Sequence, residues 1–266
     1  MSNKESTSKT LTVAFMLCMV CSIIVASSVI LLKPIQEKNK ALNLKANILA
    51  AAGLLVDAAT EEQIETAFLT IKPRIVDLDT GEYVDPGLVG EKNALDYDQR
   101  RASKDPALSN AIPKNMDIAS IKRRVKYSRV YLVEENNKTK TIILPVSGYG
   151  LWSTLHGFLA LESDANTVVG IGFYEHAETP GLGGEVDNPR WKAIWPGKKV
   201  FNLEESIVPQ LQLIKGSVDK SRPDAIYKVD GLSGATLTSR GVTQLVQYWT
   251  GKQGFQSYLN RLREGV

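Results

Sequence analysis

A short turn of hydroxyl-bearing and small residues is the part of this sequence best suited to hold a phosphate. The turn, Ser233-Gly234-Ala235-Thr236, follows a β-type run over 225–229 and precedes a helical pattern. The apolar residues of that pattern recur at i, i+3, i+4 and i+7, as Val242, Leu245, Val246 and Trp249. A strand-to-helix turn presents free backbone N–H groups and the positive end of a helix dipole, which together attract an anion. Gly234 and Ala235 let another molecule approach the backbone beside the Thr236 hydroxyl.

Taken alone, the same turn also fits an ordinary helix start, because serine and threonine are favoured as N-caps. With Asp230 upstream, however, Asp230-x-x-Ser233-Gly234-Ala235-Thr236 resembles the flavinylation motif of proteins that carry FMN joined through its phosphate to a threonine hydroxyl. The chain as a whole resembles the C subunit of the bacterial Na⁺-translocating NADH:quinone reductase, from its apolar N-terminal segment to its C-terminal helix. The resemblance implies a covalent FMN, attached by a phosphoester to Thr236. It also implies that Asp230, Ser233, Gly234 and Ala235 form the cofactor-binding turn.

Two glycine-rich breaks elsewhere in the sequence add to this resemblance. The first covers 148–153 and the second covers 176–184, and each is an ordinary turn when considered singly. Together with the Ser-Gly-Ala-Thr turn they resemble the flavin-binding domain of the family. An isoalloxazine ring needs apolar faces and backbone donors for its carbonyls, and glycines allow N–H groups to approach closely. The predicted ring-binding residues are Leu151, Trp152, Glu178, Thr179, Gly181, Leu182 and Gly183, with Gly184 beside them.

Other kinds of chemistry have little support in the sequence. It contains no Gly-x-Ser-x-Gly elbow and no Gly-x-Gly-x-x-Gly turn placed for a nicotinamide cofactor, so we expect no catalytic residue in this chain. His156 and His176 lack an acidic pair at ligand spacing, which favours structural hydrogen bonds over a metal site. Cys18 and Cys21 lie in the apolar N-terminal segment and fit small apolar residues better than a redox or metal pair. A net charge of +3 is too small to indicate nucleic acid as a partner.

The N-terminal segment predicts a transmembrane helix. Residues 11–32 carry no charged side chain and would span about 33 Å as a helix, against about 30 Å for a hydrocarbon core. A signal peptide is the alternative, with Ser27 and Ser28 near a cleavage point, but its apolar region usually has only about 7–15 residues. More lysines follow the span than precede it, which favours a cytoplasmic C-terminal domain, although long domains cross largely regardless of such charges. The family resemblance implies the opposite orientation, with a single-pass anchor in the bacterial inner membrane and a periplasmic domain.

The remaining chain predicts an α+β fold with an antiparallel sheet and flanking helices. We expect helices over 34–55, from Thr60 with a capping box to Gln63, and over 189–194. A strand and turn are expected over 75–81, and a long irregular excursion over 85–113. Two antiparallel strand pairs are expected, 127–133 with 139–146 and 155–161 with 168–174. The predicted organisation is a tail over 1–10, a transmembrane helix over 11–32, a connecting region over 33–125 packed on the domain, and an FMN-binding domain over 126–266.

The resemblance implies a flavoprotein subunit that relays electrons within a Na⁺-pumping NADH:ubiquinone reductase, with the NADH and quinone sites on partner subunits. The implied partners are other integral membrane subunits, flavin or iron–sulfur subunits, and a flavin transferase during maturation. Two alternatives stay open. The homologous G subunit of a ferredoxin:NAD⁺ reductase complex shares the flavinylation motif, although the longer chain and the segment 151–153 favour the quinone reductase. A membrane-tethered assembly or binding module without flavin would use Ser-Gly-Ala-Thr only as a helix cap.

Overall fold

The computed structural model describes residues 7–55, 58–136 and 138–265. The chain divides into two compact units, Met1–Asn43 and Leu44–Val266. The predicted boundary between 125 and 126 falls inside the second unit.

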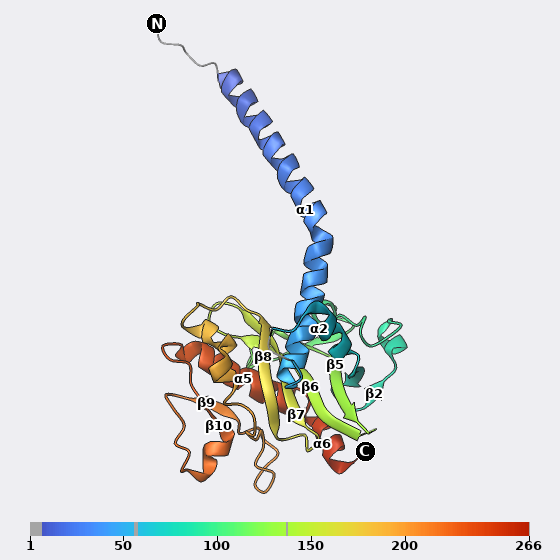
Figure 1. The fold of residues 1–266 in the computed structure, drawn as a ribbon, viewed down its shortest axis with the longest axis vertical. Helices are drawn as coiled ribbons and strands as arrows, with labels where there is room; N and C mark the ends of the chain where they lie inside the picture. Colours follow the sequence, from blue (N-terminus) through green and yellow to red (C-terminus); the bar gives the residue numbers. More distant parts are fainter. Residues whose placement is uncertain (1–6, 56–57, 137, 266) are drawn as a thin grey trace. The chain divides into compact units, whose positions relative to one another are not determined.

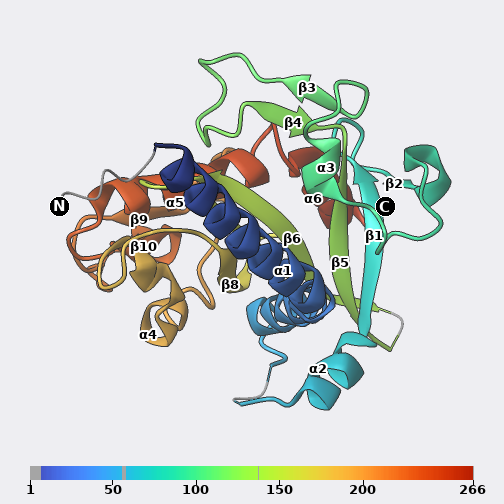
Figure 2. The ribbon, with the colours of Figure 1, turned by 90° about the horizontal axis from the view of Figure 1, so that it is seen from above.

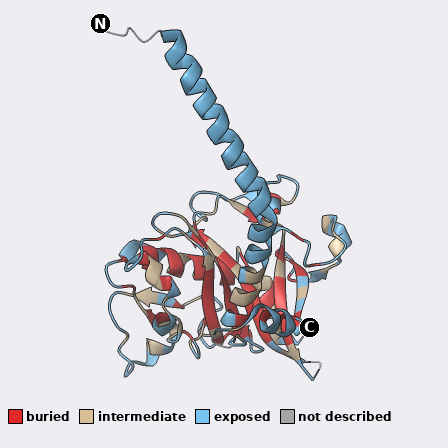
Figure 3. Cartoon of the chain, turned by 45° about the horizontal axis from the view of Figure 1, so that its top comes forward, coloured by how far each residue is buried: buried red, intermediate tan, exposed pale blue. Residues whose placement is uncertain are grey.

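The first unit consists of the larger part of helix α1 (Thr7–Ala51), which contains the whole predicted span (Figure 1). Its apolar stretch is long enough to cross a membrane and is fully exposed, so it is no core helix of a soluble domain, although a signal sequence would share its length and composition (Figure 3). Pro34 lies inside the helix without ending it. The helix ends at Ala51, four residues before the predicted end, because Gly53 adopts a left-handed backbone with φ of +69° that is typical of helix termination.

The second unit is built on a six-stranded sheet in the order β2-β1-β5-β6-β7-β8, in which every neighbouring pair is antiparallel. The strands are β1 (Ile71–Asp77), β2 (Tyr83–Val84), β5 (Tyr127–Glu135), β6 (Lys138–Tyr149), β7 (Thr154–Glu162) and β8 (Val168–Glu175). Both predicted strand pairs are confirmed, and so is the α+β class. The predicted strand at 75 begins four residues earlier, at Ile71, because all of β1 pairs with β5. The sheet therefore includes residues from both sides of position 126.

Shorter elements complete the second unit. They are α2 (Glu61–Phe68), η1 (Pro86–Val89), α3 (Gln99–Ala102), β3 (Ser109–Ala111), β4 (Arg123–Val125), η2 (Gly183–Asp187), α4 (Pro189–Lys192), β9 (Gln212–Ile214), η3 (Pro223–Tyr227), β10 (Lys228–Asp230), α5 (Thr236–Thr250) and α6 (Gln256–Glu264). The predicted capping box of α2 is confirmed: the Thr60 hydroxyl accepts from the Gln63 N–H, and the Gln63 side chain accepts from the Thr60 N–H. Three short elements apart, the excursion over 85–113 is irregular, as predicted.

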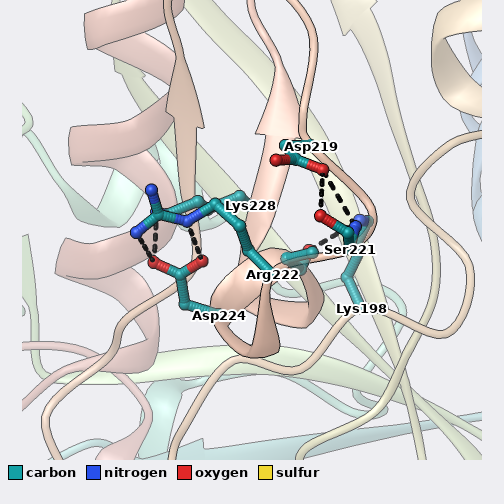
Figure 4. A network of polar contacts seen from close by, with 7 residues as sticks. Lys198, Asp219, Ser221, Arg222, Asp224 and Lys228 are labelled. Carbon is teal, nitrogen blue, oxygen red and sulfur yellow. Dashed lines mark hydrogen bonds and ion pairs between the residues drawn. The ribbon is translucent and has the colours of Figure 1, made fainter.

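The strand predicted over 225–229 is wrong for its first three residues. Residues Pro223–Tyr227 form the 3₁₀ helix η3, and only Lys228–Asp230 form a strand, which pairs in parallel with β9. Proline favours such a helical start because its φ is fixed near the helical value. Charged side chains hold the turn: Arg222 and Lys228 both bind the Asp224 carboxylate, and Lys198 Nζ donates to the Ala225 carbonyl at 2.9 Å (Figure 4).

Both faces of the sheet are covered. On one face, Ile142, Leu144 and Val146 are alternate residues of β6 and share a buried core with α5 and α6 (Figure 2). On the other face, the last residues of α1 approach β8 at Gly170, where a Cβ atom would lie 2.6 Å from the Ala51 carbonyl oxygen. Only glycine permits that approach. The start of α5 is therefore held against a rigid sheet.

Candidate functional site

Three segments meet around the carboxylate of Glu178: 150–153 after β6, 176–184 after β8, and 230–239 at the start of α5. Glu178 is only 5% exposed. Its Oε1 accepts hydrogen bonds from the backbone N–H groups of Leu151 and Trp152, both at 3.0 Å, and of Ser153 at 3.3 Å. Its Oε2 accepts from the Thr238 hydroxyl at 2.6 Å. One buried side chain thus joins both predicted ring-binding segments to the helix that carries the Ser-Gly-Ala-Thr turn.

The hydrogen bonds to Glu178 stabilise its ionised form. Burial raises the pKa of this carboxyl, but the hydrogen bonds from the Thr238 hydroxyl and from the three backbone N–H groups outweigh burial and hold the pKa below its usual value. An ionised carboxylate has only acceptor sites, and here every partner is a donor. Glu178 therefore carries its negative charge at neutral pH.

The histidine and serine neighbours of Glu178 add further connections between the two loops. Ser153 Oγ accepts from the Ala177 N–H at 2.7 Å. His176 Nε2 lies 2.8 Å from Asp187 Oδ2, and its Nδ1 accepts from the Glu178 N–H at 3.2 Å. The prediction of a structural hydrogen bond for His176 is confirmed.

His156 lies away from these contacts, half-buried beside the ring of Tyr174. Burial, followed by the nearby positive charge of Arg100, lowers the pKa of His156 to about 4, so its imidazole is neutral at physiological pH. Within the described ranges, no group of three or more His, Cys, Asp or Glu side chains could hold a metal ion.

The Ser-Gly-Ala-Thr turn does not act as a side-chain cap. The N-cap of α5 is Ala235, and in the part of the chain that the structure describes no side chain accepts from the first N–H groups of this helix. Thr236 is the first residue of α5 and is exposed. Gly234 has a left-handed φ of +70°, and a Cβ atom there would lie 2.9 Å from Cδ2 of Leu182. Leu182, from the second loop, therefore packs directly on the turn.

Other predicted residues of the turn and the loops shape the backbone. Asp230 Oδ1 accepts from the Val218 N–H at 2.8 Å, and its carbonyl accepts from Trp191 Nε1 at 3.0 Å. The carbonyl of Thr179 accepts from the N–H groups of Leu182 and Gly184. Gly181 takes a left-handed φ of +76°, Ser233 is exposed, and Gly183 is buried against Glu178.

Sequence reasoning missed four residues that hold these segments: Ser153, Trp191, Thr238 and Ser239. Ser239 Oγ, for example, accepts from the Leu232 N–H at 3.0 Å and supports the turn from the helix side. The two hydroxyls just after Thr236 are a signal that could have indicated this support. Nothing in the local sequence points to Trp191.

Exposed apolar side chains surround the turn. Trp152 is 65% exposed and Leu237 is 51% exposed, and Leu151 and Leu182 are also exposed. All four belong to the three segments that Glu178 joins. A cavity of about 300 Å³ lies elsewhere, lined by Pro209, Gln210, Gln212, Asp224, Tyr227, Lys228 and Gln247. The region around Thr236 is therefore an open surface with apolar side chains and uncapped N–H donors.

Known proteins match the chain over this region and beyond it. The FMN-binding domain family matches residues 150–251, which include all twelve predicted site residues. The C subunit of the Na(+)-translocating NADH-quinone reductase of Pseudomonas aeruginosa is 51% identical over 266 residues, covering 100% of this chain and 99% of the relative. The protein of the same name from Haemophilus ducreyi is 46% identical over 98% of this chain and 96% of the relative.

This chain belongs to the family formed by the C subunits of Na(+)-translocating NADH-quinone reductases. A solved structure agrees: Shewanella oneidensis NqrC superimposes with a TM-score of 0.75 at 36% identity, covering 85% of this chain and 99% of that one. The family resemblance predicted from sequence is thus confirmed, together with the predicted fold of an apolar N-terminal helix followed by an antiparallel-sheet domain.

Proposed function

We propose that this chain is the flavoprotein subunit of a Na⁺-translocating NADH:quinone reductase and that it relays electrons through an FMN bound covalently to Thr236. The observation that carries the proposal is an exposed threonine at an uncapped helix start, within the matched FMN-binding domain. The relatives bear the name of such a subunit. Bound FMN supplies reversible electron-transfer chemistry, and the residues of this chain hold it in place.

The residues at Thr236 fit a flavin phosphate. The first N–H groups of α5 lack side-chain acceptors in the residues described, and the helix dipole adds positive potential, so a phosphate there satisfies both. Attachment joins Thr236 Oγ to the phosphorus, while the hydroxyl loses its proton and the phosphorus loses its former substituent. The chain thereby gains the mass of FMN less one water. Exposure of Thr236 leaves the hydroxyl open to the flavin transferase that we propose attaches the cofactor.

The exposed apolar side chains fit the ring. Leu151, Trp152 and Leu182 offer faces for an isoalloxazine, and covering them with the ring removes apolar surface from water. Four predicted backbone donors are already engaged: the N–H groups of Leu151 and Trp152 bind Glu178, and those of Leu182 and Gly184 bind Thr179. Ring recognition in this proposal therefore depends mainly on apolar contact, with the protein backbone fixed beforehand.

The other proposed partners follow from the family. NADH and quinone would react on other subunits, which include integral membrane proteins and flavin or iron–sulfur proteins, and this chain would pass electrons between them. Two alternatives have less support. The relatives at 46% and 51% identity carry the name of the quinone-reductase subunit and not that of a ferredoxin:NAD⁺ reductase subunit. An assembly module whose turn only caps a helix is at odds with the missing side-chain cap among the residues described for α5.

A direct test of the function is the flavin content of denatured protein. The full chain, produced together with a flavin transferase and purified in detergent, should retain flavin fluorescence after denaturation and removal of small molecules. Protein without fluorescence would contradict the covalent link and support the assembly-module alternative.

We propose that α1 anchors the chain in the bacterial inner membrane, with the second unit on the periplasmic side. The apolar, fully exposed stretch of α1 supports the anchor. Alkaline phosphatase fused after Val266 should therefore be active, and a fluorescent reporter that matures only in the cytoplasm should stay dark at the same position. The reverse pair of results would place the domain in the cytoplasm.

A further inference from the structure

We propose that Glu178 and Thr238 are positioning residues that keep the ring-binding loops in register with the flavin-bearing turn and so set the environment of the bound flavin. The inference rests on the proposed function at Thr236. It assigns to Glu178 an indirect role, in place of the direct contact with the ring that its position in the sequence predicts.

The geometry allows Glu178 little other use. Its two oxygens accept four hydrogen bonds, three from the backbone of 151–153 and one from Thr238, which is sixty residues away in the sequence. Neither Glu178 nor Thr238 is more than 5% exposed. Thr238 lies two residues after Thr236 in the first turn of α5. The bond between Glu178 and Thr238 therefore couples the position of the flavin-bearing turn to that of the first ring-binding loop.

The backbone is closed around this carboxylate. A Cβ atom at Gly150 would lie 2.6 Å from Glu178 Oε1, and one at Gly183 would lie 2.6 Å from both Glu178 Oε2 and Thr238 Oγ1. Each ring-binding loop therefore has a glycine at its point of contact with the pair. Such packing leaves the carboxylate in one place and fixes both loops around it.

A buried charge is an expensive way to join three segments if stability is all that it provides, because apolar residues of similar volume do so at least as well. Here the charge lies at the positive end of α5, close to the turn that carries the flavin phosphate. A fixed negative charge beside a flavin opposes the gain of electrons. The pair therefore has two effects on the flavin, one through geometry and one through charge, and variants can separate them.

Thr238→Val tests the geometry. Valine keeps the shape of threonine and removes the hydroxyl that donates to Glu178, whereas Thr238→Ser retains a donor. Thr250→Val is the matched control, because Thr250 is equally buried in the same helix but donates only to the Val246 carbonyl one turn earlier. All are made in the full chain, produced with a flavin transferase, and compared for labelled fraction by mass spectrometry, visible circular dichroism and midpoint potential of the flavin, and melting temperature.

We expect Thr238→Val to keep its covalent flavin but to lose at least half of the visible circular dichroism, because the ring is no longer held in one orientation. Thr238→Ser should retain the wild-type spectrum, and Thr250→Val should lower the melting temperature without changing the spectrum. Equal spectra for Thr238→Val and wild type would overturn the positioning role, as would equal spectral losses for Thr238→Val and Thr250→Val. Wild-type protein without flavin would instead contradict the proposed function itself.

Glu178→Gln tests the charge and covers the case in which Thr238→Val does not fold. Glutamine retains an oxygen for the N–H groups of 151–153, and its amide can donate to the Thr238 hydroxyl, so the connection persists without the negative charge. The midpoint potential should shift to a more positive value while labelling is unchanged. A labelled Glu178→Gln protein with the wild-type potential would show that the carboxylate does not act on the flavin, and the inference would be wrong.

Discussion

Replacing Thr236 by alanine is expected to abolish the covalent flavin and, with it, electron transfer from NADH to quinone through the complex. A phosphoester needs a hydroxyl, and Thr236 is the one directly after Ser233-Gly234-Ala235 in the motif. The fold should be unaffected, because Thr236 is exposed and alanine suits an early helical position. The melting temperature of Thr236→Ala should therefore match that of the wild type while the flavin is absent.

Neighbouring hydroxyls serve as controls for this loss. Thr238→Ala should keep the covalent flavin, although the flavin's spectrum should change if Thr238 positions the loops. Thr236→Ser retains the reacting oxygen, so partial labelling is expected if the transferase tolerates the missing methyl group. Mass spectrometry of the tryptic peptide Val229–Arg240 separates the variants. A Thr236→Ala peptide that still carries the mass of FMN less one water would disprove attachment at this residue.

Gly183→Val is expected to disturb the site from inside the protein. The sequence alone predicts that a side chain at this position crowds the flavin ring. In the structure its Cβ would first meet Glu178 Oε2 and Thr238 Oγ1, both at 2.6 Å. Both groups would have to move, at a cost of about 1–3 kcal/mol that is typical of overpacking. We therefore expect a lower melting temperature together with a changed flavin spectrum, while covalent labelling at Thr236 persists.

Gly181→Asn is the matched control in the same loop. A Cβ atom at Gly181 would meet nothing within 4 Å in the described structure, and asparagine tolerates the left-handed φ of +76° found there. Its melting temperature and spectrum should stay close to those of the wild type. If Gly183→Val leaves both properties unchanged, then the packing around Glu178 does not influence the flavin.

Local sequence patterns were sufficient for most elements of the fold. The spacing of Val242, Leu245, Val246 and Trp249 predicted α5, and all four are buried on its inner face. The alternating strands of β5 to β8, the capping box at Thr60 and the apolar stretch of α1 were also predicted. Such features depend on the backbone period and on neighbours within a few residues, which are visible in a single sequence. The errors lie where local signals conflict, as at 225–227, where β-type residues follow Pro223 and form η3.

By itself, the sequence determined the candidate for modification, Thr236, the glycine-rich loops and the family, because these depend on residue types at short spacing. Only the tertiary structure decided how they meet. Leu182 packs on Gly234, Asp230 binds the backbone of Val218, and Glu178 joins two loops to α5 through the Thr238 hydroxyl. These contacts connect residues up to sixty positions apart, and no periodicity relates such distant positions. Glu178 therefore looks in sequence like a polar edge for the flavin, whereas folding buries it among donors that local sequence cannot identify.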